Sequence, residues 1–236
     1  MIQVYPAASR YMADHGWLKS NFSFSFADYY DPSNMSFGPM RVLNDDFVAP
    51  LEGFGMHPHR EMEIVSIVLT GKLEHRDSLG NHAVTGFGEV QRMSAGTGIY
   101  HSEMSASETE TLNFLQMWFM PSHAHIHPSY ETTEFDVERM KNALLPVVST
   151  QGGENIASIH QDMTIYLSDI DADASVAFRT EPGRNIFFFV IDGEVTLNGE
   201  EKLMRRDSAR ITDVSDLLIQ ASTDARIMLI DLTGAY

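Results

Sequence analysis

The chain has 236 residues, 43% of them hydrophobic, which is enough apolar content for one large or two small packed domains. Its 16 basic and 33 acidic residues give a formal net charge of −17, which disfavours direct binding to a nucleic-acid backbone. No apolar run reaches the roughly 18 residues of a membrane span, and no signal peptide is expected. The sequence contains no cysteine, so disulfides are excluded and a cytoplasmic location is expected.

The first predicted element lies in the segment 17–35, which is rich in Phe, Ser and Tyr. Phe22, Phe24 and Phe26 alternate with serines, and this period of two predicts a strand with one buried face. We expect these rings to belong to the core rather than to a ligand-binding platform.

Two short motifs further along the chain carry side chains that bind metals. His57-Pro58-His59 and His101-Ser102-Glu103 both place such residues at positions i and i+2, which face the same way in a strand. On neighbouring strands, the two motifs would bring three imidazoles and one carboxylate around one point. That donor set suits a divalent transition metal, and an octahedral ion would keep two positions open.

The surroundings of both motifs support a barrel. The β-branched, apolar run 61–71 predicts a largely buried strand, and the parity of His57 and His59 continues through Glu61 and Glu63 to Val65. We therefore expect polar groups at the mouth of a barrel and apolar groups deeper inside. The glycines of the segment 96–98 permit a tight turn just before the second motif.

Four other histidines are possible ligands. His123, His125 and His127 have strand spacing, but they lie between Pro121 and Pro128 and have no matching carboxylate, so an exposed loop is predicted. His75 is interpreted as a turn residue whose hydrogen bonds are satisfied locally.

The second half of the chain repeats the pattern of the first. The run 64–71 resembles the run 186–193 at an offset of 122 residues, and the same offset places Arg179 at the position of His57 and Glu181 at that of His59. Only His160 lies beyond His127. These observations predict a second barrel without a metal site.

A short linking helix is expected within residues 133–144, ended by Pro146. The predicted domains are therefore residues 1–134, with the metal site, and residues 135–236, without it.

Taken together, these motifs resemble the pirin family of the cupin superfamily, in particular its bacterial members with quercetin 2,3-dioxygenase activity. The matching stretches are 57–63, 75–80 and 94–103, and the similarity is dense from about residue 47 to 121. The resemblance implies an all-β bicupin, with two β-barrel (double-stranded β-helix) domains and a short linking helix. Many pirins have Gly-Phe where this chain has Glu61-Met62, a difference at the expected mouth of the pocket.

The resemblance also implies the site residues. Its four metal ligands fall on His57, His59, His101 and Glu103. Glu63 occupies the position where many cupins place their carboxylate ligand, but the pirin pattern gives that role to Glu103. Glu63 would then be a hydrogen-bond partner of a ligand, or a proton acceptor near the substrate. Glu63, or Glu103 if it detaches from the metal, is thus the candidate catalytic base.

The implied function is a metal-dependent dioxygenase that cleaves the heterocyclic ring of a flavonol such as quercetin with dioxygen. The resemblance makes iron(II) the first expectation, although the donor set also admits nickel, copper, manganese, cobalt or zinc. Two alternatives stay open: another activity on a small enol or phenol, and a metal-containing regulator that binds a partner protein. Neither nucleic acid nor membrane is an expected partner.

Overall fold

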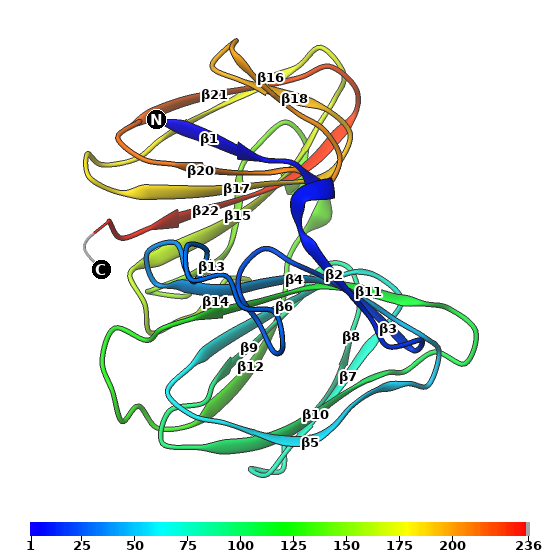
Figure 1. Cartoon of the computed structure of the whole chain (residues 1–236). Helices are drawn as coiled ribbons and strands as arrows, with labels where there is room; N and C mark the ends of the chain where they lie inside the picture. Colours follow the sequence, from blue (N-terminus) through cyan, green and yellow to red (C-terminus); the bar gives the residue numbers. More distant parts are fainter. Residues whose placement is uncertain (235–236) are drawn as a thin grey trace. The chain divides into compact units, whose positions relative to one another are not determined.

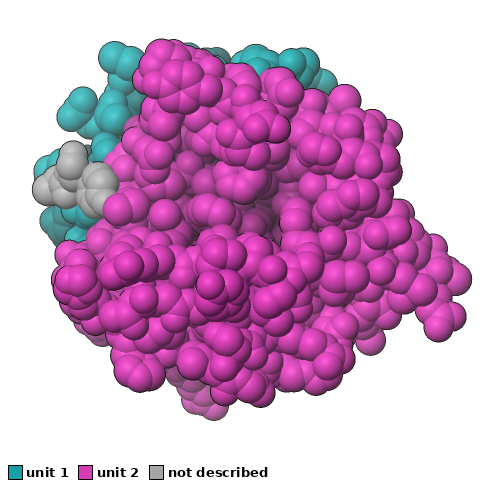
Figure 2. Space-filling model, turned by 60° about the horizontal axis from the view of Figure 1, so that its bottom comes forward, with its two compact units in different colours: residues 1–10, 136–150, 162–236 teal, residues 11–135, 151–161 magenta. Residues whose placement is uncertain are grey.

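The computed structural model describes residues 1–234 and divides the chain into two compact units (Figure 2). Unit 1 comprises residues 1–10, 136–150 and 162–236, and unit 2 comprises residues 11–135 and 151–161. Two short segments, 1–10 and 151–161, therefore group with the other half of the sequence. The sequence-based division into residues 1–134 and 135–236 stays a prediction.

Unit 2 contains two antiparallel sheets (Figure 1). The larger has the order β12-β9-β6-β11-β4-β3-β2 and the smaller the order β5-β10-β7-β8. The strands are β2 (Tyr11–Asp14), β3 (Leu18–Phe22), β4 (Met40–Val48), β5 (Gly53–His59), β6 (Glu63–Thr70), β7 (Leu73–Asp77), β8 (His82–Thr85), β9 (Glu89–Ser94), β10 (Ile99–Ser105), β11 (Leu112–Phe119) and β12 (Ser129–Glu134), with the short β14 (Ala157–Ser158).

Unit 1 repeats this topology. Its strands follow the orders β1-β20-β17-β22-β15-β13 and β16-β21-β18-β19, so that β17 takes the place of β6 and β16 that of β5. The predicted repeat at an offset of 122 residues is confirmed. The strands are β1 (Ile2–Tyr5), β13 (Leu145–Ser149), β15 (Met163–Ile170), β16 (Ser175–Arg179), β17 (Asn185–Asp192), β18 (Val195–Leu197), β19 (Glu201–Leu203), β20 (Ser208–Ile211), β21 (Asp216–Ala221) and β22 (Ala225–Leu232).

The linking helix is shorter than the sequence suggests. Residues up to Glu134 belong to β12, which pairs with β9, and the helix is a single 3-10 turn, η2 (Val137–Met140). The Asp136 side chain caps it by accepting from the Glu138 backbone N–H. A second 3-10 turn, η1, spans Ala7–Ser9. None of the helices in residues 1–234 is long and apolar enough to cross a membrane.

The interiors of the two units differ in polarity. Unit 1 has a continuous apolar core, in which residues such as Phe188, Leu197 and Ile227 are completely buried. Unit 2 has apolar clusters, but it also buries many polar side chains, among them Asn44, Asp46, Glu63, Ser66, His75, His101, Glu103 and Gln116. Because buried polar groups must be paired or used, the interior of unit 2 is where a site is expected.

Candidate metal centre

The chain turns sharply just after the first histidine motif. β5 ends at His59 in the smaller sheet and β6 begins at Glu63 in the larger one. Between them Glu61 has a φ of +50°, and its backbone N–H donates to the Gly96 carbonyl. The expectation that one face continues from His57 through Glu63 to Val65 is therefore wrong, because a left-handed residue moves the chain from one sheet to the other.

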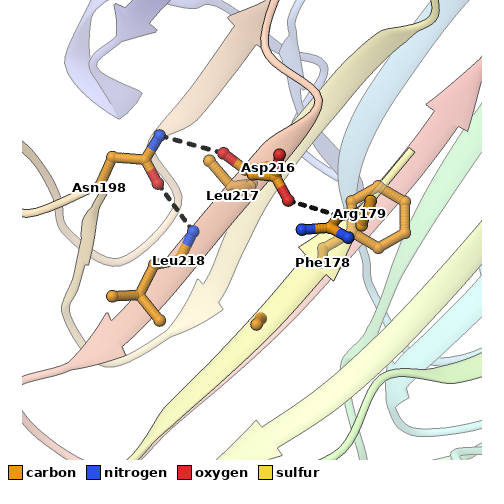
Figure 3. A pocket seen from close by; sticks show the side chains of 7 residues that line it. Phe178, Arg179, Asn198, Asp216, Leu217 and Leu218 are labelled. Carbon is orange, nitrogen blue, oxygen red and sulfur yellow. Dashed lines mark hydrogen bonds and ion pairs between the residues drawn. The ribbon is translucent and has the colours of Figure 1, made fainter. Parts of the chain in front are cut away.

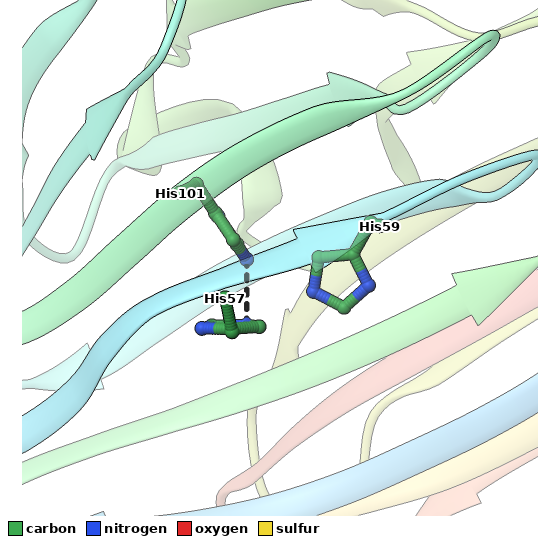
Figure 4. Close-up of side chains that lie close together, drawn as sticks. All are labelled: His57, His59 and His101. Carbon is green, nitrogen blue, oxygen red and sulfur yellow. Dashed lines mark hydrogen bonds between the residues drawn. The ribbon is translucent and has the colours of Figure 1, made fainter.

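The two motifs nevertheless lie side by side. β5 and β10 pair antiparallel, with His101 opposite His57 and Ile99 opposite His59. Nε2 of His101 lies 3.0 Å from Nε2 of His57, and one nitrogen from each of the three imidazoles lies within 4.8 Å of the others. Figure 4 shows His101 reaching from β10 toward His57, with His59 beside them on β5.

A β-bulge adjusts this arrangement. The register shifts between His101 and Glu103, so that Glu103 lies opposite Phe54 rather than opposite the residue two before His57. Within the bulge, the Gly55 carbonyl oxygen lies 2.7 Å from Nδ1 of His57. A carbonyl can only accept, so Nδ1 carries the proton and the lone pair of Nε2 faces His101.

Glu103 is buried beside the imidazoles. Its Oε2 lies 4.0 Å from Nε2 of His101 and accepts from Nε2 of Gln116 at 2.6 Å, while Ser66 Oγ donates to its Oε1 at 3.3 Å. Glu103, His75 and His101 form a second group of donor atoms within 4.8 Å. Burial raises the pKa of the Glu103 carboxyl, and the hydrogen bond from Gln116 opposes that shift.

The imidazoles of His59 and His101 are neutral at physiological pH. Burial, together with the neighbouring imidazoles, lowers the pKa of His59 and of His101 to about 3. Two imidazole nitrogens 3.0 Å apart share either a proton or a cation. Three imidazoles and a buried carboxylate form a donor set that fits a divalent transition metal.

His75 belongs to this centre, and its interpretation as a locally satisfied turn residue is incomplete. It is buried on β7, with its Nδ1 3.4 Å from Nδ1 of His101 and its Nε2 3.2 Å from Oδ2 of Asp77. Its ring stacks on Tyr130 at 4.0 Å. The available signal was the spacing of His75 and Asp77, which is the same i, i+2 pattern on a strand.

Glu63 lies in different surroundings. It is fully buried, and its Oε2 accepts from Ser94 Oγ at 2.9 Å and from the His160 backbone N–H at 3.1 Å. It belongs to neither donor group found among residues 1–234. Its role as a proton acceptor near a substrate stays a prediction.

The histidine-rich loop lies apart from the centre, between β11 and β12. His123, His125 and His127 are exposed, and the His125 backbone N–H donates to the Glu61 carboxylate at 3.0 Å. Within the described part of the chain, none of the three joins a group of donors spaced to hold a metal.

The corresponding strands of unit 1 carry an ion pair instead of imidazoles. β16 pairs with β21 so that Arg179 lies opposite Asp216, as His57 lies opposite His101. Arg179 Nε contacts Asp216 Oδ1 at 2.6 Å beside an open pocket (Figure 3). Asn198 also lines this pocket, and its Oδ1 accepts a hydrogen bond from the Leu218 backbone N–H at 2.7 Å.

Two repeated double-sheet units, one with converging imidazoles on paired strands, define a two-barrel cupin. The sequence model of pirin matches residues 5–119, and that of the quercetinase C-terminal cupin domain matches residues 146–232. Quercetin 2,3-dioxygenase of Escherichia coli K12 is 41% identical over 232 residues, which are 98% of this chain and 99% of that protein. The chain belongs to the pirin family.

Solved structures agree with this assignment. A crystal structure of the bacterial pirin YhhW from Escherichia coli, in complex with nickel(II), is 41% identical and superposes with a TM-score of 0.93 over 99% of both chains. Quercetin 2,3-dioxygenase from Acinetobacter baumannii is 20% identical, with a TM-score of 0.78 over 98% of this chain and 86% of that one. The similarity to the Acinetobacter protein shows that the two chains share a fold.

Proposed function

We propose that this protein is a metal-dependent dioxygenase that opens the heterocyclic ring of a flavonol such as quercetin with dioxygen. The observation that carries the proposal is the convergence of three imidazole nitrogens, from His57, His59 and His101, within 4.8 Å. The names of the relatives at about 40% identity supply the substrate class and the reaction.

The ligands would be His57, His59, His101 and Glu103. We propose iron(II) as the native ion, while the nickel complex of YhhW supports a divalent transition metal in general. When bound, the ion supplies a Lewis acid that favours loss of the proton from the flavonol 3-hydroxyl.

The protein side chains then handle that proton. Glu103 is a candidate base if it detaches from the ion, because burial raises the pKa of its carboxyl and makes it a better proton acceptor than an exposed carboxylate. Gln116 and Ser66 hold that carboxylate in place through the two hydrogen bonds described above. Glu63 is the second candidate, since its Oε1 is buried and has no hydrogen-bond partner in the described structure.

Apolar walls help to exclude water from the centre. The Trp118 ring packs edge-on against His59 with ring centroids 4.7 Å apart, and Phe54 packs against His57 at 6.5 Å. Such packing also restricts the imidazoles to one orientation, which a preorganised site requires.

Oxygen consumption tests the proposal directly. Metal-replete protein, purified without an affinity tag, should consume dioxygen when quercetin is added, and His101→Ala should not. The triple variant in which His123, His125 and His127 are replaced by alanine should keep the activity and serves as the control. Metal-replete protein that binds quercetin but consumes no oxygen would contradict the dioxygenase and favour a binding or regulatory role.

Elemental analysis tests the choice of metal separately. Protein isolated under anaerobic conditions should contain close to one iron per chain. A different ion at that stoichiometry would overturn iron while leaving the centre itself supported.

A further inference from the structure

A second feature of unit 2 is a cavity of about 270 Å³ that adjoins the candidate metal centre. Gln116 lines the cavity and also donates to Glu103, and Phe54 lines it and also packs against His57. Pockets that enclose a whole drug-sized ligand measure about 300–1,000 Å³. This cavity is therefore of a size to receive one end of a three-ring molecule held at the centre.

Most of the cavity wall is aromatic. Trp17 and Phe54 meet edge to face with ring centroids 5.3 Å apart, and Phe22 and Phe26 do so at 5.2 Å. All four rings line the cavity. Such walls favour a flat aromatic ring over a flexible aliphatic chain.

One side of the cavity is polar. Ser20, Asn44, Asp46 and Gln116 line it from the larger sheet, where β3 and β4 place Ser20 opposite Asp46, and β4 and β11 place Asn44 opposite Gln116. All four side chains are buried. These four side chains form a polar strip, which lies on three adjacent strands rather than on a loop.

Asn44 is the member of this strip whose hydrogen bonding is incomplete. Its side chain is only 2% exposed, and its Oδ1 has no hydrogen-bond partner in the described structure. A buried amide oxygen without a protein partner is unfavourable, so a ligand in this cavity that donates to it would be favoured. Asp46 accepts a hydrogen bond from Ser20 at Oδ1, which fixes the carboxyl beside the amide.

We propose that this cavity receives the hydroxylated pendant ring of the flavonol, whose phenolic hydroxyls donate to the amide oxygen of Asn44 and to the carboxyl of Asp46. The proposal rests on the proposed function, because it assumes that the rest of the substrate lies at the metal centre. It makes Asn44 and Asp46 specificity-determining residues that distinguish flavonols by the hydroxyls on that ring.

The electrostatics of the strip favour a neutral donor over an acidic ligand. Burial raises the pKa of the Asp46 carboxyl to about 7, and the nearby carboxylates of Asp45 and Glu103 add to the shift. A carboxylate on the ligand would meet this cluster of like charges without a basic residue among those that line the cavity, apart from His15. A phenolic hydroxyl avoids that repulsion and supplies the missing donor.

Anaerobic binding tests the proposal, because oxygen-free conditions prevent turnover. The dissociation constant of the full, metal-loaded chain is measured for quercetin, which carries two hydroxyls on the pendant ring, and for galangin, which carries none. Quercetin should bind about tenfold more tightly, the effect expected when a buried acceptor gains or loses its partner. Equal affinities in the wild-type protein would overturn the proposal.

Substitution locates the effect. Asn44→Leu keeps the side-chain volume but removes the acceptor, so the preference for quercetin should fall to less than about threefold. The matched control is Asn21→Leu, on β3 directly next to Ser20 and therefore on the opposite face, which should keep the tenfold preference. If circular dichroism shows that Asn44→Leu is unfolded, Asn44→Ala carries the same prediction. An unchanged preference in a folded Asn44 variant would overturn the assignment.

The outcome is separable from that of the oxygen experiment. If the protein discriminates between the two flavonols but consumes no oxygen, the dioxygenase proposal is contradicted and the ring-binding cavity is supported. If it consumes oxygen but binds the two flavonols equally well, the dioxygenase proposal is supported and the ring-binding cavity is contradicted.

Discussion

His75 contacts His101 on the nitrogen that faces away from His57. Asp77 can only accept, so Nε2 of His75 carries a proton, and its Nδ1 is then free to accept from Nδ1 of His101. This chain of contacts leaves the lone pair of His101 on Nε2, directed at His57. We therefore propose Asp77 and His75 as positioning residues for His101, one of the proposed ligands.

Asp77→Asn should lower metal affinity by about 10- to 100-fold while all four proposed ligands remain. The introduced side-chain amide can donate a hydrogen bond, which permits the wrong tautomer of His75 and hence of His101. Competition with a chelator of known affinity measures the change. Glu74→Gln, on the same strand and outside the contact chain, should leave affinity unaltered. Equal affinity in Asp77→Asn and the wild type would contradict the positioning role.

Asp46 links the cavity to the stability of the fold. Burial raises the pKa of its carboxyl from 3.8 to about 7, so the folded chain holds a proton there that the unfolded chain releases. The stabilisation due to this proton is fully present below about pH 4 and is lost as the pH rises toward 7. Its slope is at most about 1.4 kcal/mol per pH unit.

Asp46→Asn should remove this contribution while keeping an oxygen that can accept from Ser20. The unfolding free energy of the wild type minus that of the variant should therefore decrease between pH 4 and 7. The subtraction removes the pH-dependent contribution of the histidines, which both proteins share. Urea titrations at several pH values measure the difference. Asp14→Asn, at an exposed carboxyl, is the matched control for the chemical change itself. A flat difference for Asp46→Asn would contradict the raised pKa.

At the scale of elements, the turn before β10 depends on Gly96. Its φ is +46°, and a Cβ added there would lie 1.9 Å from the carbonyl oxygen of Ile126 in the histidine-rich loop. Thr97 donates its backbone N–H to the same oxygen. The loop therefore packs on the turn that leads to His101, which gives it a structural role.

Gly96→Ala should lower the unfolding free energy by at least about 2 kcal/mol, because both the clash and the left-handed backbone oppose it. Gly80→Ala provides the comparison, since its φ is +89° but open space surrounds the added Cβ. Gly80→Ala should lower the unfolding free energy by only about 1 kcal/mol. Chemical denaturation of both variants measures the losses, and equal losses would show that the close approach to Ile126 does not matter.

The elements also show where sequence patterns stop being informative. The i, i+2 spacing located β5 and β10, because alternation in a strand fixes which side chains share a face. It could not reveal the turn at Glu61, since a non-glycine residue with positive φ leaves no composition signal. Asn44 was likewise missed, because nothing in the polar run Asn44-Asp45-Asp46 marks which side chain lines a cavity.

At the scale of the whole molecule, the sequence revealed the repeated domain. It did not reveal that segments 1–10 and 151–161 each group with the other half of the chain. The offset of 122 residues followed from matching apolar runs and turns, which are local features. The pairing of β1 with β20, with Ile2 opposite Ile211, joins positions that no local pattern relates. The two barrels then diverged in chemistry, because an Arg179–Asp216 ion pair stands where unit 2 pairs His57 with His101.

The central claim concerns which residues hold the metal, and metal content per chain tests it most directly. Single alanine substitutions at His57, His59, His101 and Glu103 should each reduce metal occupancy sharply, because each removes a ligand. Glu63→Ala should reduce turnover more than occupancy. Circular dichroism should show a folded chain throughout, since the cores of both units are largely apolar.

The control is the triple alanine variant at His123, His125 and His127, which removes as many imidazoles as the proposed ligand set contains. It should retain the wild-type metal content. The account predicts metal loss in His101→Ala and none in the triple variant. A triple variant that loses the metal, together with a folded His101→Ala chain that keeps it, would contradict the assignment.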